Sequence, residues 1–321
     1  MSFLALLAAV APVFLIIGAG YIIRRIHWLS VDADASLMRV IVNLLFPCLI
    51  LDTILGNAAL QKAGNVLLAP AVGFFTVVLG YLVCYYAAPL FGVRDTRQRR
   101  TFAFTAGIYN YAYVPLPLIP KLFPADAAST TAILFIHNVG VEIALWTAGV
   151  VLLTGAANPA GDERRWTHLF NGPVVAILAA IALHFCGARL WLPEIALSAI
   201  HSMGAAALPL GLILTGATFA DQMRHLSIEG GASVSIGSVL LRLGIIPLLM
   251  LALARWLPCP IELRRIIVVQ AAMPCALIPV LLSKHYGGDP GVAMRIVLVT
   301  TALGLVTIPL WIQAGLWWIH C

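Results

Sequence analysis

Long hydrophobic stretches alternate with short polar connections along almost the entire chain. A helix that crosses a bilayer needs about 20 consecutive, mostly apolar residues. Ten stretches meet this requirement and are predicted to be membrane-spanning helices: 3–23, 36–55, 64–88, 101–120, 129–154, 171–188, 196–220, 231–254, 264–283 and 294–318. The longest polar connection, Asn158 to His168, has only about a dozen residues. The whole chain, 1–321, is therefore expected to form a single membrane domain.

The two halves of the chain resemble each other at a nearly constant offset of about 163 residues. The matching positions are Pro12-Val13 and Pro173-Val174, Trp28-Leu29 and Trp191-Leu192, Pro47 and Pro209, Arg99-Arg100 and Arg264-Arg265, and Asp126 and Asp289. Such duplication in an apolar chain is typical of transporters built from two structural repeats. Five helices in 1–157 and five in 158–321 would place the halves in opposite orientations. We therefore predict an all-α membrane fold of two inverted repeats.

Prolines interrupt two spans in the middle, at equivalent positions of the two halves. The fourth span reads Gly107-Ile-Tyr-Asn-Tyr-Ala-Tyr-Val-Pro-Leu-Pro117, and the ninth reads Gln270-Ala-Ala-Met-Pro-Cys-Ala-Leu-Ile-Pro279. Proline removes a backbone donor and clashes with the preceding turn, which frees polar backbone groups at mid-membrane depth. We expect both helices to break there and to present half-helix N-termini that attract anions. Other prolines are expected only to kink their helices: Pro12, Pro70, Pro173, Pro209 and Pro247.

Composition agrees with a membrane protein. The chain is 62% hydrophobic and 10% charged, and its mean hydropathy is +1.00, values that a soluble protein of this length does not show. The six cysteines include no Cys-x-x-Cys pair, so neither a disulfide framework nor a zinc site is indicated. The net charge of +6 comes from basic residues in short loops, which favours a role in orientation over nucleic-acid binding.

The distribution of lysine and arginine predicts the orientation. With the N-terminus outside, the inner loops carry twelve of these residues and the outer loops six, so both termini are expected on the periplasmic or extracellular side. The pair Arg264-Arg265 runs against this bias, as an inverted copy of Arg99-Arg100 would. The first span has no basic segment before it and ends in Arg24-Arg25, which favours a retained helix over a signal peptide.

Six ionisable residues lie within or near the apolar stretches, where charge is costly: Asp52, His137, Glu142, His184, His201 and Arg242. Asn138 and Glu142 are four apart and share one helix face. Glu142 is expected either to carry protons or to hydrogen-bond freed backbone. Arg242 is expected either to face a substrate carboxylate or to form an ion pair with Glu142 or Asp52. His184 and His201 are interpreted as packing residues.

Several short motifs together resemble the auxin efflux carrier family. They are Asn43-Leu-Leu-Phe-Pro-Cys-Leu-Ile50, Leu208-Pro-Leu-Gly-Leu-Ile-Leu-Thr-Gly-Ala217, Arg242-Leu-Gly-Ile-Ile-Pro247, Ala272-Met-Pro-Cys-Ala276, Tyr286-Gly-Gly-Asp289 and Thr300-Thr-Ala-Leu-Gly-Leu-Val-Thr-Ile-Pro309. The family includes plant PIN-type carriers and bacterial transporters of malate- or malonate-like acids. The chain lacks the long hydrophilic loop of the plant carriers and in this respect resembles the bacterial branch of the family. This resemblance implies that the protein is located in the bacterial inner membrane. Plant carriers have an asparagine beside proline in both broken helices. In this chain Asn110 matches the position in the fourth helix, but the ninth helix has Met273-Pro274-Cys275 instead. This departure argues against auxin itself as the substrate.

The resemblance implies a fold similar to that of bile-acid transporters, with crossing broken helices four and nine. It implies a scaffold of helices one, two, six and seven, and a transport unit of helices three to five and eight to ten. It also implies a homodimer and an elevator-like movement. The residues around the crossing are the predicted substrate site: Asn110, Tyr111, Tyr113, Pro115, Gln270, Met273, Pro274, Cys275, Asn138, Thr300 and Thr301. Glu142, His137 and Arg242 are the candidates for proton or ion coupling.

The predicted function is secondary active or facilitative transport of small organic anions, such as malonate, malate or auxin-like acids. A sodium-coupled symporter of the bile-acid type is the alternative, and a channel is less favoured. An enzyme is not expected, because the chain has neither a Gly-x-Ser-x-Gly-like nucleophile motif nor a His-Glu-x-x-His pair. No cofactor or metal is predicted. The expected partners are the organic acid, the lipid bilayer, a second copy of the chain, and a proton or sodium ion.

Overall fold

The computed structural model is built of helices over the residues that it describes, which are 2–61, 63–155, 172–223 and 231–319. Within these ranges it has no β-strand, and Tyr109 and Cys275 form an isolated antiparallel bridge. The expected junction of the halves at 157/158 lies outside the described residues. So do the polar connection Asn158 to His168, with Arg164 and Arg165, and the loop residue Arg224.

The helices in chain order are α1 (Phe3–Arg25), α2 (Val31–Val40), α3 (Phe46–Ile54), α4 (Ala63–Ala87), α5 (Thr96–Gly107), α6 (Pro115–Leu122), α7 (Ala127–Ala144), α8 (Val150–Thr154), α10 (Gly172–Phe185), α11 (Ala188–Trp191), α12 (Glu194–Gln222), α13 (Ala232–Leu240), α14 (Ile246–Trp256), α15 (Ile261–Ala272), α16 (Ile278–His285) and α17 (Pro290–Trp318). Single π-helical turns join α2 to α3, α7 to α8 and α13 to α14: η1 (Ile41–Leu45), η5 (Leu145–Gly149) and η7 (Leu241–Ile245). Short 3-10 turns are η2 (Ala58–Gln61), η3 (Ala88–Phe91) and η4 (Pro124–Asp126).

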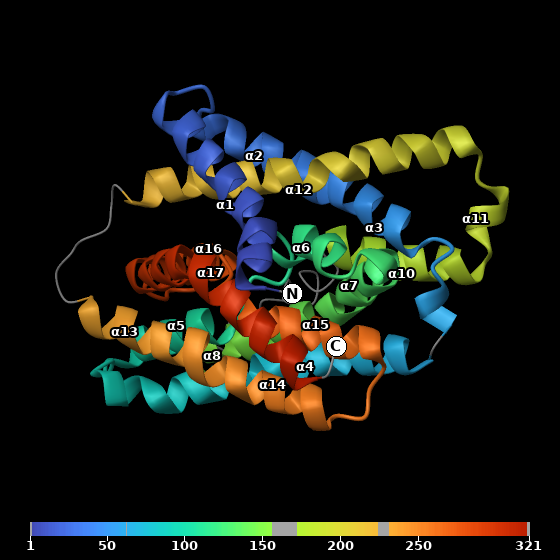
Figure 1. Ribbon diagram of the computed structural model, residues 1–321. Coiled ribbons are helices and arrows are strands. Elements are labelled where there is room, and N and C mark those ends of the chain that lie inside the picture. Colours follow the sequence, from blue (N-terminus) through green and yellow to red (C-terminus); the bar gives the residue numbers. More distant parts are fainter. Residues whose placement is uncertain (1, 62, 156–171, 224–230, 320–321) are drawn as a thin grey trace.

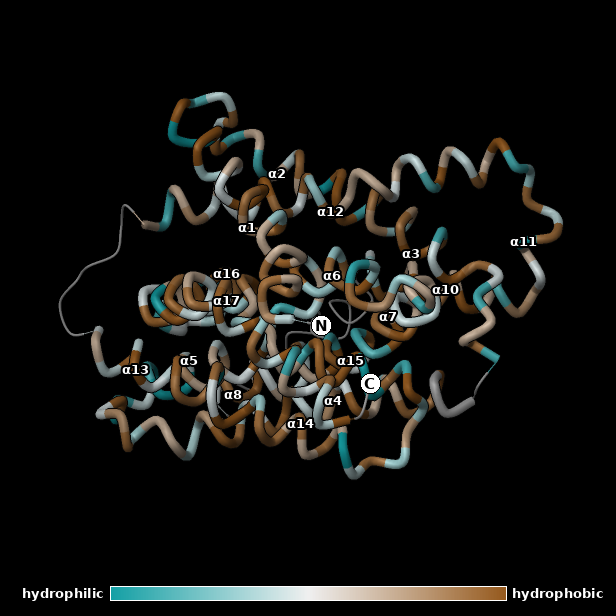
Figure 2. Tube along the Cα trace, in the orientation of Figure 1, coloured by the Kyte–Doolittle hydropathy of each residue, from teal (hydrophilic) through white to brown (hydrophobic). Residues whose placement is uncertain are grey.

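Seven helical segments in the described part of the chain are long and apolar enough to cross a membrane: Phe3–Arg25, Val31–Ile54, Val66–Phe91, Pro124–Thr154, Glu194–Gln222, Ala232–Trp256 and Pro290–Trp318. Helix α10 is apolar but shorter. Hydrophobic residues run along most helices, while hydrophilic residues gather in turns such as the one between α1 and α2 (Figure 2). These features confirm the predicted multi-pass helical membrane protein.

The fourth and ninth predicted spans are each two half-helices separated by an extended segment. Helix α5 ends at Gly107 and α6 begins at Pro115, whereas α15 ends at Ala272 and α16 begins at Ile278. The two extended segments cross and exchange backbone hydrogen bonds. The amide of Asn110 donates to the carbonyl of Pro274 (2.7 Å), and that of Ala276 donates to the carbonyl of Ile108 (3.2 Å). In contrast, Pro12, Pro70 and Pro209 lie inside continuous helices.

Two groups of helices are visible in the ribbon diagram. Helices α1, α2, α3 and α12 lie on one side, and α4, α5, α13, α14 and α15 on the other (Figure 1). In the first group α1 and α12 approach closely, because a Cβ added to Gly20 or Gly216 would overlap the backbone of the other helix. Small residues of this kind let transmembrane helices pack backbone to backbone.

Both broken helices are tied to the loop that follows the other one. Near the start of α5, Arg97 donates to the carbonyl of Gly288 (2.6 and 3.0 Å) and the hydroxyl of Thr101 accepts from the amide of Asp289 (2.9 Å). Near the start of α15, Arg265 forms an ion pair with Asp126 (2.7 Å), in the loop after α6. Contacts at both ends therefore hold the two half-helix pairs together.

Candidate functional site

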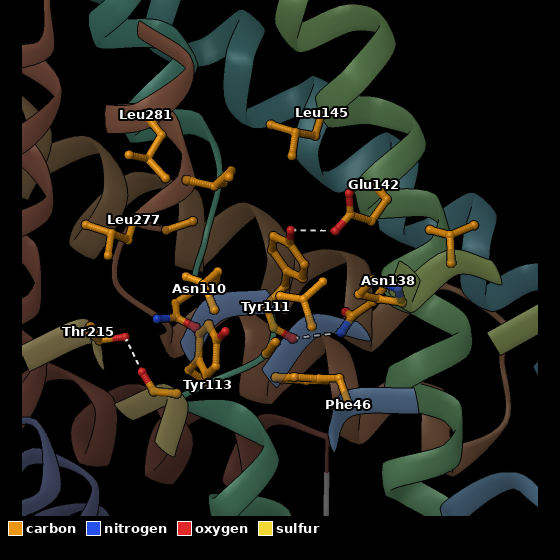
Figure 3. A pocket seen from close by; sticks show the side chains of 18 of the residues that line it. Phe46, Asn110, Tyr111, Tyr113, Asn138, Glu142, Leu145, Thr215, Leu277 and Leu281 are labelled. Carbon is orange, nitrogen blue, oxygen red and sulfur yellow. Dashed lines mark hydrogen bonds between the residues drawn. The ribbon is translucent and has the colours of Figure 1, made fainter. Parts of the chain in front are cut away.

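A cavity of about 330 Å³ lies beside the crossing of the extended segments. One wall comes from α2, η1, α3, α10 and α12, and the other from the crossing segments, α7, η5 and α16 (Figure 3). The lining residues are Met38, Val42, Phe46, Ile50, Asn110, Tyr111, Ala112, Tyr113, Phe135, Asn138, Glu142, Leu145, Trp146, Pro173, Val174, Ile177, Gly211, Leu214, Thr215, Thr218, Ala276, Leu277, Ile278 and Leu281. Most of them are apolar, as in sites that bind small molecules.

Glu142 is the carboxylate in this cavity. Its Oε1 accepts a hydrogen bond from the hydroxyl of Tyr111 (2.7 Å), and its Oε2 accepts one from the indole of Trp146 (3.0 Å). It lies one turn before the π-helical turn η5, a feature that is frequent at functional sites. Both carboxylate oxygens are therefore oriented by the cavity wall itself.

The carbonyl group of Tyr111 is freed by the break between α5 and α6 and receives two side-chain donors. The Nδ2 of Asn138 lies 2.8 Å from it and the Nε2 of Gln270 lies 3.3 Å from it. A carbonyl at this depth must find a partner within the protein. Asn138 and Gln270 thus stabilise the crossing from α7 and α15 respectively.

Asn110 and Tyr113 extend from the crossing into the cavity (Figure 3). The Oδ1 of Asn110 accepts from the amide of Val114 (3.4 Å). The ring of Tyr113 packs edge-on against Phe46 of α3, with ring centroids 5.5 Å apart. A Cβ added to Gly211 of α12 would overlap the same ring. Tyr113 therefore fills the narrow space between the crossing and the helices of the opposite wall.

A buried chain of polar groups supports the crossing from behind. The hydroxyl groups of Thr76 and Tyr109 share a 2.9 Å hydrogen bond, and the Tyr109 hydroxyl lies 3.5 Å from Nε2 of His137. The Nδ1 of His137 lies 3.3 Å from Oδ1 of Asn138. These hydrogen bonds connect α4 to Asn138, whose side chain donates to the carbonyl of Tyr111. His137 therefore positions Asn138 and does not line the cavity.

Arg242 is fully buried and donates to backbone carbonyls at the end of α15, those of Met273 (3.0 Å), Gln270 (3.1 Å) and Ala271 (3.4 Å). The predicted ion pair of Arg242 with Glu142 or Asp52 is wrong. The physical reason is that the broken helix exposes acceptors closer to the guanidinium. Asp52 instead lies 2.9 Å from the Nδ1 of His201, which corrects the interpretation of His201 as a packing residue.

The structure brings five of the predicted residues to the cavity: Asn110, Tyr111, Tyr113, Asn138 and Glu142. The others surround the crossing without lining the cavity: Pro115, Gln270, Met273, Pro274, Cys275, Thr300, Thr301, His137 and Arg242. Among them, Thr300 accepts from the amide of Cys275 through its hydroxyl (3.3 Å). It therefore supports the second break as Asn138 supports the first.

Sequence reasoning missed the wall formed by α2, η1, α3, α10 and α12. Phe46 and Thr215 lie within two of the motifs that carried the family resemblance, 43–50 and 208–217. Those motifs were the only signal that could have identified them. Neither residue is ionisable or adjacent to a helix break, so local chemistry gave them no distinguishing feature.

The fold and the cavity together define a multi-pass helical membrane protein with an internal site at the crossing of two broken helices. Residues 5–312 match the family described as Membrane transport protein, and the chain belongs to this family, that of the auxin efflux carriers. An uncharacterized transporter from Methanothermobacter thermautotrophicus is 25% identical over 312 residues, which cover 97% of this chain and 99% of that protein. The resemblance expected from the motifs is confirmed.

Proposed function

We propose that the protein is a secondary active or facilitative transporter of small organic anions, with carboxylates such as malonate, malate or auxin-like acids as substrates. The observation that carries this proposal is the cavity itself, which joins polar groups of the crossing to an apolar wall. The side chains of Asn110 and Glu142 line the same cavity as apolar side chains such as Phe46 and Leu277 (Figure 3). Such a mixed lining suits an acid with an apolar body.

Anion selectivity is expected from the half-helices. Helices α6 and α16 begin at the crossing, at Pro115 and Ile278, so their N-termini lie there. The amide groups and dipole of a helix N-terminus attract negative charge. In a membrane interior this attraction acts with little screening, so two such termini at one depth favour a carboxylate over a neutral molecule.

The transport cycle proposed here is an elevator movement of one helix group against the other. The ten predicted helices would form two inverted repeats, with α1, α2–α3, α10 and α12 as the scaffold and the remaining helices as the transport unit. The position of the cavity between these two groups supports this division. The contacts of Arg97 and Arg265 with the opposite loops support movement of the transport unit as one body. A homodimer would anchor the scaffold.

The cavity is proposed to open toward the cytoplasm. Its lining residues come from the start of α10 (Pro173, Val174, Ile177) and the last turns of α12 (Leu214, Thr215, Thr218). Those ends belong to the side with more lysine and arginine, which the positive-inside rule assigns to the cytoplasm of a bacterial cell. Both termini would then face the periplasm.

Coupling to protons is proposed to involve Glu142, the carboxylate in the cavity wall. Sodium coupling is less well supported. Discontinuous-helix symporters coordinate sodium with freed carbonyl oxygens, but here the carbonyls of Tyr111, Gln270 and Met273 accept hydrogen bonds from side chains. Those acceptors are already engaged by protein donors.

Purified protein in liposomes tests the proposal. A thermal-shift screen of mono- and dicarboxylates should identify an acid that raises the unfolding temperature, because binding to the folded state stabilises it. Uptake of that acid should saturate and should proceed without sodium. Strict sodium dependence would instead support the bile-acid type of symport, and flux that does not saturate would support a channel. Absence of any carboxylate binding or uptake would overturn the proposed function.

A further inference from the structure

Arg242 is a fully buried cation beside the second broken helix. It lies on the π-helical turn η7 and its side chain is 0% exposed. Its Nε and one terminal nitrogen donate to the carbonyls of Met273, Gln270 and Ala271, the last residues of α15 and the first of the crossing segment. The guanidinium therefore caps the C-terminus of a half-helix, where a cation is favourable.

The cap offsets only part of this charge. A helix C-terminus carries roughly half an elementary negative charge, and no carboxylate pairs with Arg242 in the part of the chain that the structure describes. The ionisable groups that interact with Arg242 electrostatically are the thiols of Cys84 and Cys275 and the phenol of Tyr109, whose ring lies 5.2 Å from the guanidinium carbon. The Nη1 atom is buried without a hydrogen-bond acceptor.

Gln270 connects this charge to the wall of the cavity. Gln270 accepts from Arg242 through its carbonyl, and its side chain donates to the carbonyl of Tyr111, which lines the cavity. Gln270, Met273 and Tyr109 are all 0% exposed. Because these residues fill the space and exclude water, the field of Arg242 reaches the crossing with weak screening.

We propose that Arg242 sets the charge preference of the cavity: it stabilises a bound monoanion at the crossing through its field, from behind the wall and without contact. This inference rests on the proposed function and narrows the substrate class to a monocarboxylate with an apolar body. Glu142 repels any carboxylate in the cavity, and the lining residues of the described part of the chain include no lysine or arginine that would balance a second one. One charge acting over about 10 Å at an effective dielectric of about 20 changes anion affinity on the order of tenfold.

The potential at the crossing can be measured without knowing the substrate. A reporter cysteine is placed at Ala112, in the cavity wall beside Tyr111, and a second reporter at Thr218, which lines the same cavity about two turns of α12 beyond Gly211, the residue that faces Tyr113. Cys186 and Cys259, which are not buried, are replaced by serine together with the C-terminal Cys321, and Glu142→Gln removes the cavity carboxylate. Each reporter is then reacted with an anionic sulfonatoethyl and a cationic trimethylammonioethyl methanethiosulfonate. The ratio of the two rates reports the local potential.

The expected result depends on charge and on position. Arg242→Gln should lower the anion-to-cation rate ratio at the Ala112→Cys reporter on the order of tenfold, and less at the Thr218→Cys reporter. Arg242→Lys should keep the ratio close to its original value, although it cannot reproduce the planar guanidinium contacts. An unchanged ratio in a folded Arg242→Gln variant would overturn the proposal, since a purely structural cap would not affect a potential.

The reporter with Arg242 intact provides a second test that does not need the substitution to fold. Its rate ratio should exceed that of 2-mercaptoethanol in solution, and a ratio at or below that of the free thiol would overturn the proposal. The measurement needs no transported acid. A failure of carboxylate uptake would therefore contradict the proposed function while leaving the charge preference measurable, so the two failures are distinguishable.

Discussion

The hydroxyl of Tyr111 donates a 2.7 Å hydrogen bond to Glu142, while the carbonyl of the same tyrosine accepts one from Asn138. Tyr111 thus connects the break between α5 and α6 to two positions of α7 that lie one turn apart. Protonation of Glu142 would change the strength of the first bond, because a hydrogen bond to a charged acceptor is stronger than one to a neutral group. The cavity carboxylate and the crossing are therefore linked through one side chain.

The substitution Glu142→Gln is expected to alter the pH dependence of carboxylate uptake, since the amide keeps the size of the side chain but cannot carry the proton. Uptake into liposomes across a range of external pH is the measurement. Glu194→Gln provides a control, because Glu194 is exposed at the start of α12 and far from the cavity along that helix. An unchanged pH profile of uptake in Glu142→Gln would show that Glu142 has only a structural role.

Replacing Asn110 or Pro274 by alanine is expected to reduce uptake while membrane insertion is retained. Asn110 loses the side chain that accepts from the amide of Val114, and Pro274→Ala allows the second break to relax toward helix. A reduction of roughly tenfold would correspond to about 1.4 kcal/mol. Pro12→Ala, within the continuous helix α1, is the matched control. Full uptake by both site variants would refute the assignment of the crossing as the substrate site.

Gly211→Ala is expected to destabilise the protein, because the added methyl group would overlap the ring of Tyr113. Overpacking of this kind typically costs about 1–3 kcal/mol, which would appear as a lower thermal unfolding midpoint and a loss of uptake. Gly18→Ala is the control, since a Cβ at Gly18 in α1 meets no atom within 4 Å. Equal midpoints for the two variants would show that Tyr113 does not require this space.

Cross-linking can test which helices move together. A short bifunctional reagent that joins cysteines at Asp126 and Arg265 should leave uptake intact, because both positions belong to the proposed transport unit. The same reagent between cysteines at Phe46 and Tyr113 should abolish uptake, because these rings pack across the two helix groups. Uptake that survives the second cross-link would contradict the elevator movement.

The sequence predicted those parts of the site that depend on local chemistry. The two breaks were predictable because prolines recur at equivalent mid-span positions of both halves, whereas single prolines such as Pro12 lie inside continuous helices. Asn138 and Glu142 were readable because residues four apart share a helix face. The partners of Arg242 could not be predicted, because they are backbone carbonyls, which carry no sequence signature. The opposite cavity wall also depends on packing between distant helices, which periodicity does not specify.

The crossing also constrains how the protein is made. The amide of Asn110 finds its acceptor in Pro274, a residue synthesised about 160 positions later. At common rates of about 5–20 residues per second, the first break waits roughly 8–30 seconds for its partner. During that interval the segment between α5 and α6 carries polar backbone groups that hydrocarbon cannot satisfy. Until the second half is synthesised, these backbone groups must therefore form hydrogen bonds with the insertion machinery or with water.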